Sequence, residues 1–88
     1  MDYYRIEVKQ SAARDIKKIP KIYIKKITSS VTELERNPFP GSCKKIKSSE
    51  SMYRIRIGDY RVIYEVITNE KLVIIHYIRH RKDVYRNL

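Results

Sequence analysis

The segment Tyr53–Val66, YRIRIGDYRVIYEV, restricts the fold of this chain more than any other stretch. Apolar and polar residues alternate on both sides of Gly58-Asp59, which is typical of a β-hairpin with a tight turn. A two- or four-residue loop centred on this dipeptide fixes the register of the two strands. That register places three apolar pairs on one face: Tyr53 with Tyr64, Ile55 with Val62, and Ile57 with Tyr60.

The same register gathers arginines on the other face, with Arg56 directly opposite Arg61 and Arg54 two residues along. Like charges that face each other in a sheet are destabilising, by up to about 1 kcal/mol. One explanation is a solvated face on which the arginine stems lie flat. The pairing itself depends on the turn, because a three-residue loop would remove it. We favour a phosphate site, because guanidinium groups donate paired hydrogen bonds to phosphate oxygens and stay charged at any relevant pH.

The remaining pattern predicts one α+β domain, residues 1–88, in the order β-α-α-β-β-β. Residues 3–8 alternate like a strand, and Ser11 is a plausible N-cap for a short helix that Pro20 ends. A second helix is expected over residues 21–36, and the apolar run 72–78 is expected to be a central strand. We therefore expect a small twisted antiparallel sheet with an N-terminal helical hairpin packed on one face.

Charge restricts the possible partners. The 88 residues include 20 Lys and Arg against 10 Asp and Glu, a net charge of +10. Such an excess favours a polyanionic partner such as nucleic acid, although basic surfaces also keep small proteins in solution. Cys43 is the single cysteine, and the chain has neither zinc-type spacing nor an apolar run of 18 residues. We expect a cytoplasmic protein that needs no metal, cofactor or membrane.

A second basic cluster follows the last predicted strand. It comprises Arg79, His80, Arg81 and Lys82, with Tyr85 close behind. These residues form a basic tail, or they extend the arginine face and place the Tyr85 ring where a base can stack on it. The choice depends on the turn formed by residues 68–71, which the sequence does not fix.

Together these residues resemble the signature of the RelE/ParE toxin superfamily, the toxin halves of toxin–antitoxin pairs. The resemblance rests on MYRIRIGDYRVIYEV followed by IRHRKDVY, and SAARDIKKIP and ELERNPFPGSCKKIK extend it over the whole chain. RelE-type members are ribosome-dependent endonucleases that cut mRNA in the ribosomal A site. The resemblance implies catalytic roles by position for Arg54, Arg56, Arg61, Arg81 and Tyr85.

In this scheme the arginines stabilise the scissile phosphate during attack by the 2′-OH, and Tyr85 stacks on a base. The proton acceptor stays open: His80 and Glu65 are candidates, whereas His76 within the apolar strand reads as structural. Further RNA contacts are expected from a set of basic residues: Lys44, Lys45, Lys47, Arg79 and Lys82.

The implied partners are the ribosome with its mRNA, and a cognate acidic, RelB-like antitoxin that folds on the basic surface. Two other functions remain open. One is a ParE-like toxin that binds DNA gyrase without nuclease chemistry, and the other is a general nucleic-acid binder that relies on its charge.

Overall fold

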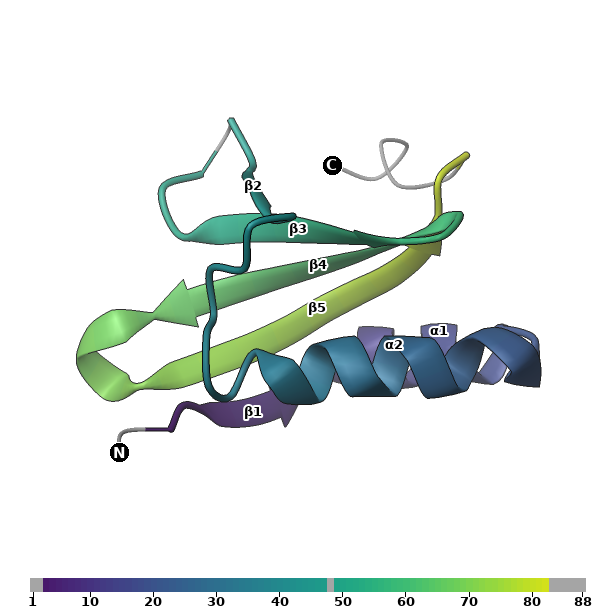
Figure 1. Ribbon diagram of the computed structural model, residues 1–88, viewed down its shortest axis with the longest axis horizontal. Helices are drawn as coiled ribbons and strands as arrows, with labels where there is room; N and C mark the ends of the chain where they lie inside the picture. Colours follow the sequence, from purple (N-terminus) through teal and green to yellow (C-terminus); the bar gives the residue numbers. More distant parts are fainter. Residues whose placement is uncertain (1–2, 48, 83–88) are drawn as a thin grey trace.

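Five strands make one open sheet in the computed structural model, which describes residues 3–47 and 49–82 (Figure 1). Neighbouring strands run antiparallel except β1 and β5, which run parallel, so the sheet is mixed. Two helices, α1 (Gln10–Lys17) and α2 (Lys21–Glu33), follow β1 along the chain. The predicted α+β class is confirmed, but the sheet that was expected to be antiparallel is mixed, because β1 pairs in parallel with β5. Across the sheet the order is β1 (Arg5–Val8), β5 (Leu72–His80), β4 (Tyr60–Ile67), β3 (Met52–Ile57) and β2 (Lys44–Lys45).

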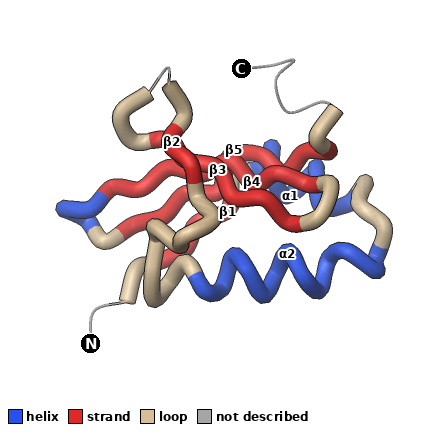
Figure 2. The backbone as a smooth tube through the Cα atoms, turned by 45° about the horizontal axis from the view of Figure 1, so that its top comes forward, coloured by secondary structure: helices blue, strands red, loops and turns tan. Residues whose placement is uncertain are grey.

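Both helices cover the same face of the sheet, and the core lies between the helices and that face. Figure 2 shows α2 running along one side of the strands. Ala12 of α1 and Ile27 of α2 are 0% and 3% exposed, and Leu34 just after α2 is 1% exposed. They pack in one cluster with buried residues of β3, β4 and β5, namely Ile55, Val62, Tyr64, Val66, Val73, Ile75 and Ile78.

The β3–β4 hairpin has the predicted register. Tyr53 pairs with Tyr64, Ile55 with Val62, and Arg56 with Arg61. Because successive residues of a strand point to opposite faces, the apolar pairs lie against the helices and the arginine pair lies on the outer face. The sequence prediction of two faces with different chemistry is therefore confirmed for this hairpin.

The helix boundaries differ from those expected. α1 begins at Gln10, with Lys9 rather than Ser11 at the N-cap position, and α2 ends at Glu33. Ser11 uses its hydroxyl elsewhere, donating a 2.6 Å hydrogen bond to the carbonyl oxygen of His76 in β5. After Glu33 the chain tightens into hydrogen bonds three residues apart, such as Arg36 N to Glu33 O, so the helix does not reach residue 36.

Side chains of α1 complete the edge of β5 where β1 ends. β1 pairs with β5 only up to Val8 and Ile75. Beyond that point the Ser11 hydroxyl bonds the His76 carbonyl, and the Asp15 carboxylate accepts a 2.9 Å bond from the Ile78 N–H. These two contacts satisfy backbone groups that would otherwise lie exposed at an open strand edge.

Tyr64 ties the core to the loop after α2. Its side chain is fully buried, and its hydroxyl donates a 2.8 Å hydrogen bond to the carbonyl oxygen of Pro38. Burial, with a smaller contribution from nearby Cys43, raises the pKa of the Tyr64 phenol above its ordinary value of 10.0. The neutral phenol is therefore the form that this core accommodates.

The connection between β4 and β5 is a short 3-10 helix, Thr68–Glu70, followed by Lys71 at a φ of 53°. It was expected as a simple turn. Among the described residues, no helix is long and apolar enough to cross a membrane.

Candidate functional site

The outer face of the sheet carries a row of three arginines on three adjacent strands. Arg56 on β3 pairs with Arg61 on β4, and Arg61 pairs in turn with Arg79 on β5. Two residues before Arg56, on the same face of β3, Arg54 pairs with Ile63 of β4 on one side and with Lys44 of β2 on the other. The short strand β2, which the sequence did not predict, therefore adds a lysine to this face.

Four of these basic residues line one open pocket of about 410 Å³. None of the described residues that line this pocket is acidic, so its potential is positive and suits an anion. The lining brings together predicted catalytic arginines of β3 and β4 with one predicted RNA-binding lysine. We call it the arginine pocket; its residues are Ser42, Lys44, Arg54, Arg56, Gly58 and Arg61.

Gly58 orients two of the guanidinium groups. Its carbonyl oxygen accepts hydrogen bonds from Arg56 Nε at 3.3 Å and from Arg61 Nη1 at 3.4 Å. Its φ of 59° lies in the left-handed region, which glycine adopts without steric cost. The hairpin turn thus holds two like-charged side chains around one acceptor, which offsets part of their repulsion.

The two arginines at the end of β5 have different surroundings. Arg79 donates from Nε to the Asp15 carboxylate at 3.0 Å, and its guanidinium carbon lies 4.8 Å from the centroid of the Tyr77 ring. Asp15 is 9% exposed and is the buried charged residue of the described chain. The Asp15 carboxylate therefore compensates the positive charge of Arg79, which gives Arg79 a structural role. The RNA contact predicted for Arg79 stays a prediction.

Arg81 lies next to the hairpin turn. Its backbone N–H donates to the carbonyl oxygen of Asp59 at 2.7 Å, and its Nε lies 3.8 Å from Asp59 Oδ1. The two side chains are more than half exposed, so the ion pair is weak and open to exchange. Asp59 directly follows Gly58 of the arginine pocket, so Arg81 is held within reach of the pocket's rim.

His80 does not join the arginine pocket. It pairs with Tyr60, one residue before Arg61, and so its side chain lies on the face opposite to that of Arg61. Its ring packs edge-on against the Tyr60 ring, with centroids 5.5 Å apart, and its Nδ1 accepts a bond from the Lys82 N–H. The sheet therefore separates His80, predicted as a candidate proton acceptor, from the phosphate site.

The other predicted residues spread around the pocket. Lys45 pairs with Tyr53 and so lies on the opposite face of β2 from Lys44, whereas Lys47 and Lys82 are exposed beyond the strand ends. Tyr85 lies outside the described residues.

A β-bulge in β5 places two further side chains on the outer face. Ile63 pairs with Tyr77 but Tyr64 pairs with Ile75, so His76 is an extra residue in β5. His76 Nε2 lies 3.0 Å from Oε1 of Glu65, which shares the outer face with Arg61 and Ile63. Nothing in the sequence predicted this bulge, because the apolar run around it contains neither Gly nor Pro.

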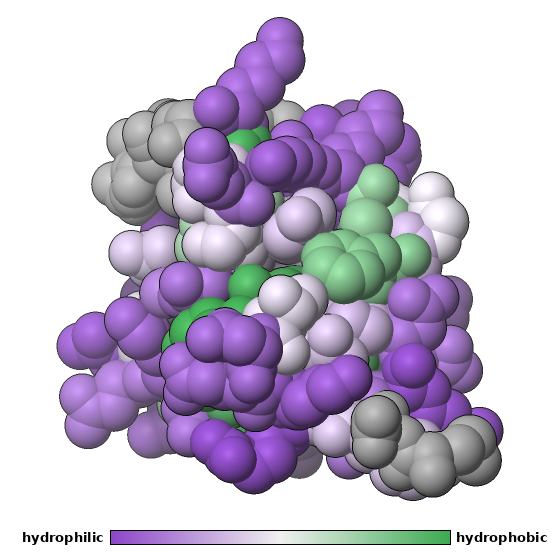
Figure 3. Space-filling view, turned by 90° about the vertical axis from the view of Figure 1, so that its left-hand side faces the viewer, coloured by the Kyte–Doolittle hydropathy of each residue, from purple (hydrophilic) through white to green (hydrophobic). Residues whose placement is uncertain are grey.

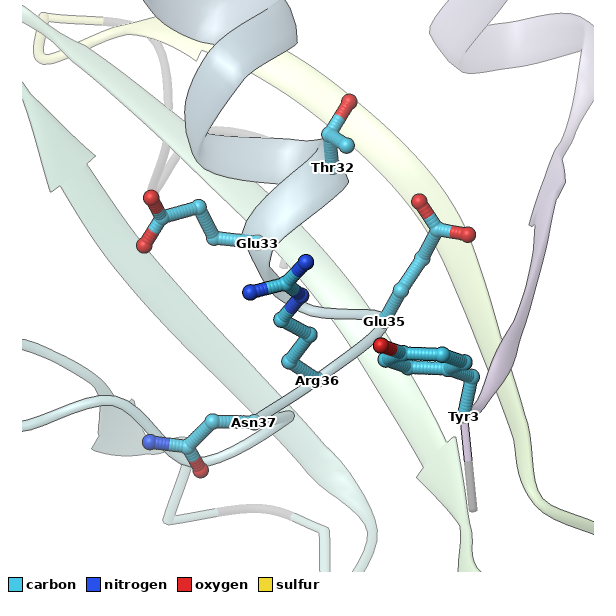
Figure 4. Close-up of a pocket in the computed structure, with 6 residues that line it drawn as sticks. All are labelled: Tyr3, Thr32, Glu33, Glu35, Arg36 and Asn37. Atoms are coloured by element: carbon cyan, nitrogen blue, oxygen red, sulfur yellow. The ribbon is translucent and has the colours of Figure 1, made fainter. Parts of the chain in front are cut away.

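A second pocket, of about 530 Å³, has a different character (Figure 4). The Arg36 side chain lies between those of Glu33 and Glu35, and its guanidinium carbon is 5.8 Å from the centroid of the Tyr3 ring. Two carboxylates outweigh one guanidinium, so this lining does not favour an anion. It is lined by Tyr3, which precedes β1, and by residues at and after the end of α2: Thr32, Glu33, Glu35, Arg36 and Asn37.

One face of the molecule is predominantly polar. On the face drawn in Figure 3, hydrophilic residues surround a narrow hydrophobic band. Among the described residues, no group of three or more His, Cys, Asp or Glu side chains is arranged to hold a metal ion. Of the two pockets above, the arginine pocket has a lining whose charged residues are all basic, whereas the pocket at Arg36 has both signs of charge.

Comparison with known proteins finds similarity over nearly the whole chain. A family model described as the ParE toxin of type II toxin–antitoxin systems, parDE, matches residues 6–85. RelE1 of Methanocaldococcus jannaschii is 32% identical over 87 residues, covering 96% of this chain and 97% of that protein.

Two solved complexes have the same fold. The archaeal RelE–RelB complex from Pyrococcus horikoshii OT3 gives a TM-score of 0.80 at 28% identity, covering 92% of this chain and 97% of the matched chain. The RelB–RelE antitoxin–toxin complex from Methanococcus jannaschii gives 0.78 at 27% identity, covering 93% and 98%.

Proposed function

Because the chain belongs to the ParE/RelE family of toxins from type II toxin–antitoxin systems, we propose that it is a ribosome-dependent endoribonuclease that cleaves mRNA in the A site. The observation that carries this proposal is the arginine pocket: a cavity on the outer sheet face with Lys44, Arg54, Arg56 and Arg61 in its lining. Such a site suits an RNA phosphate. The RelE name of the archaeal relative favours this activity over gyrase binding.

In the proposed reaction the 2′-oxygen of the nucleotide attacks the adjacent phosphorus. The O2′–P bond forms and the P–O5′ bond breaks, which leaves a 2′,3′-cyclic phosphate and a 5′-hydroxyl. Negative charge builds on the non-bridging phosphate oxygens, and preorganised guanidinium donors stabilise that charge. Arg56 and Arg61, both held by the Gly58 carbonyl, take this role.

Two proton transfers complete the reaction. The 2′-OH loses a proton and the leaving 5′-oxygen gains one. Arg81, at the rim of the pocket beside Asp59, is assigned to the leaving oxygen: its charge stabilises that oxygen, and its guanidinium is the proposed donor of the proton. His80 lies across the sheet, so we do not assign the first proton to it; Glu65, on the outer face, remains the candidate acceptor among the described residues.

Catalysis in this proposal depends on position more than on a strong base. An RNA strand held in line with its 2′-OH near the phosphorus gains rate from orientation alone. The ribosome supplies that orientation, and the pocket supplies the charge. This division explains why a small open site without a deep cleft would act on ribosome-bound mRNA.

The cognate partner in this proposal is an antitoxin. The similar archaeal structures are RelB–RelE complexes. With a net charge of +10 and no acidic lining residue among those described for the arginine pocket, this toxin suits an antitoxin with an acidic segment. Such a segment would neutralise the basic surface and exclude RNA from it.

The test uses purified protein and ribosomes programmed with a defined mRNA. Primer extension maps any cuts, and the proposal expects them within the A-site codon only when ribosomes are present. DNA breaks that require gyrase would instead assign a ParE-like activity. If the protein binds nucleic acid in a way that salt abolishes, and neither assay detects cleavage, it would be assigned as a general nucleic-acid binder.

A further inference from the structure

The β-bulge at His76 changes which side chains the outer face presents. In a regular strand successive side chains point to opposite faces. Here Tyr77 pairs with Ile63 on the outer face, and the preceding His76 also reaches outer-face Glu65 at 3.0 Å. Bulges of this kind re-aim side chains and are common beside active sites.

Two contacts hold the bulge. The carbonyl oxygen of His76 accepts the 2.6 Å bond from the Ser11 hydroxyl of α1. The His76 ring is bonded to Glu65, whose other carboxylate oxygen accepts a 3.5 Å bond from Ser51. The irregularity is therefore anchored through both its backbone and its side chain.

Tyr77 lies beside the arginine pocket. Its cross-strand neighbour on β4 is Ile63, which lies two positions after Arg61 and two positions before Glu65 on the same face. Arg61 lines the arginine pocket. Diagonal neighbours of this type lie about 7–8 Å apart, within reach of aromatic side chains. One nucleotide can therefore contact both the pocket and the Tyr77 ring.

Tyr77 has two neighbours that define its surroundings, Ile63 and Arg79. Ile63 is 1% exposed although it lies on the face away from the helices, and its two cross-strand neighbours are Arg54 and Tyr77. The Arg79 guanidinium, fixed by Asp15, lies 4.8 Å from the Tyr77 ring centroid. Aromatic rings and guanidinium planes are the groups on which proteins stack unpaired RNA bases.

We propose that Tyr77, with the Glu65–His76 pair at its side, forms a nucleobase subsite next to the arginine pocket. It takes the base of a nucleotide adjacent to the scissile phosphate, in addition to any contact made by Tyr85. The His76 and Tyr77 rings are 6.4 Å apart, so the pair lies at the edge of a stacked base, where hydrogen-bonding groups of the base are found. This subsite rests on the proposed RNA function.

The experiment measures the affinity of the full-length toxin for ribosomes programmed with mRNA whose A-site codon is 2′-O-methylated and so resists cleavage. Tyr77→Leu keeps an apolar cover on Ile63 but removes the ring, and it should weaken binding between about five- and 150-fold. Tyr77→Phe should restore the affinity. Arg14→Ala, which removes an exposed charge on α1, is the control for charge alone.

A second set of mRNAs carries an abasic nucleotide at each codon position in turn. At one position the abasic mRNA should bind the wild type and Tyr77→Leu equally, because the base that stacks on Tyr77 is gone. An equal loss on every abasic mRNA, or a Tyr77→Phe variant as weak as Tyr77→Leu, would overturn the subsite. Arg61→Ala separates the two proposals: if it binds and cleaves like the wild type, the phosphate site fails whatever Tyr77 does.

Discussion

Arg56 and Arg61 face each other across β3 and β4, and both donate to the carbonyl oxygen of Gly58. A folded protein gains no net stability from opposing two guanidinium groups, since like-charged cross-strand pairs are unfavourable. The pair is expected where an anion enters between the charges. Function and stability therefore make opposite demands on these positions, which the following variants can separate.

Replacing Arg61 by alanine should lower the rate of mRNA cleavage on programmed ribosomes by about 10²–10³-fold, the usual cost of losing one preorganised donor to a transition state. The free energy of unfolding should stay the same or rise by up to about 1 kcal/mol, because a repulsive pair is removed. Arg81→Ala should also abolish most cleavage. Arg14→Ala serves as the charge-matched control, and full activity in both the Arg61 and the Arg81 variants would refute the assignment.

Gly58→Ala should destabilise the protein by about 1–2 kcal/mol, because alanine at a φ of 59° suffers the left-handed clash. No other atom lies within 4 Å of the position a Cβ would occupy, so the effect is conformational and not steric crowding. Gly41→Ala is the matched control: its Cβ also enters open space and its φ is not in the left-handed range. Equal stabilities in urea unfolding would contradict the argument.

Asp15→Ala should destabilise the fold by about 3 kcal/mol, since it leaves the Ile78 N–H and the Arg79 guanidinium without this carboxylate. Asp15→Asn should cost less, because the amide oxygen still accepts from Ile78. The comparison is Glu7→Gln on the exposed Arg5–Glu7 pair, at 3.9 Å, for which a change below about 0.5 kcal/mol is expected. Denaturant unfolding of the three variants ranks these effects, and a similar loss for Glu7→Gln would contradict the special role of Asp15.

Tyr64 predicts a loss of stability at alkaline pH. Its pKa is raised in the folded protein, so the unfolded chain releases the phenolic proton first as the pH rises. The stabilising contribution is complete below pH 10.0, the ordinary value, and is lost progressively above it. Tyr64→Phe should cost about 0.5–1.5 kcal/mol near neutral pH, through the lost bond to Pro38, and should flatten the alkaline decline. An equally steep decline in the variant would assign it to other groups.

Part of the fold followed from local pattern. The alternation around Gly58-Asp59 fixed both the register of the hairpin and the face on which the arginines lie, because strand period and turn length are local properties. The apolar stripes of the two helices likewise identified the face that packs on the sheet.

The remainder depends on contacts between distant segments. The pattern in residues 3–8 identified a strand but not its parallel partner, since pairing with β5 depends on the whole topology. Asp15 gave no sign of its bond to Ile78, which lies 63 residues away. The face on which His80 lies could not be predicted either, because it depends on the register of β5 against β4. The bulge that turns His76 towards Glu65 on the outer face depends in part on Ser11, 65 residues earlier.

The position of β1 in the sheet also determines when, during synthesis of the chain, the sheet can be completed. Arg5 at the start of the chain pairs with Leu72, so the N-terminal strand has no sheet partner until the final strand has been synthesised. Contacts so far apart in sequence form late and slowly, because a long loop must close first. During translation β3 and β4 are made before β5, so Arg79 and Arg81 join the hairpin only afterwards. The row of arginines on the outer face is therefore incomplete in a nascent chain until β5 has been made and has paired with β4.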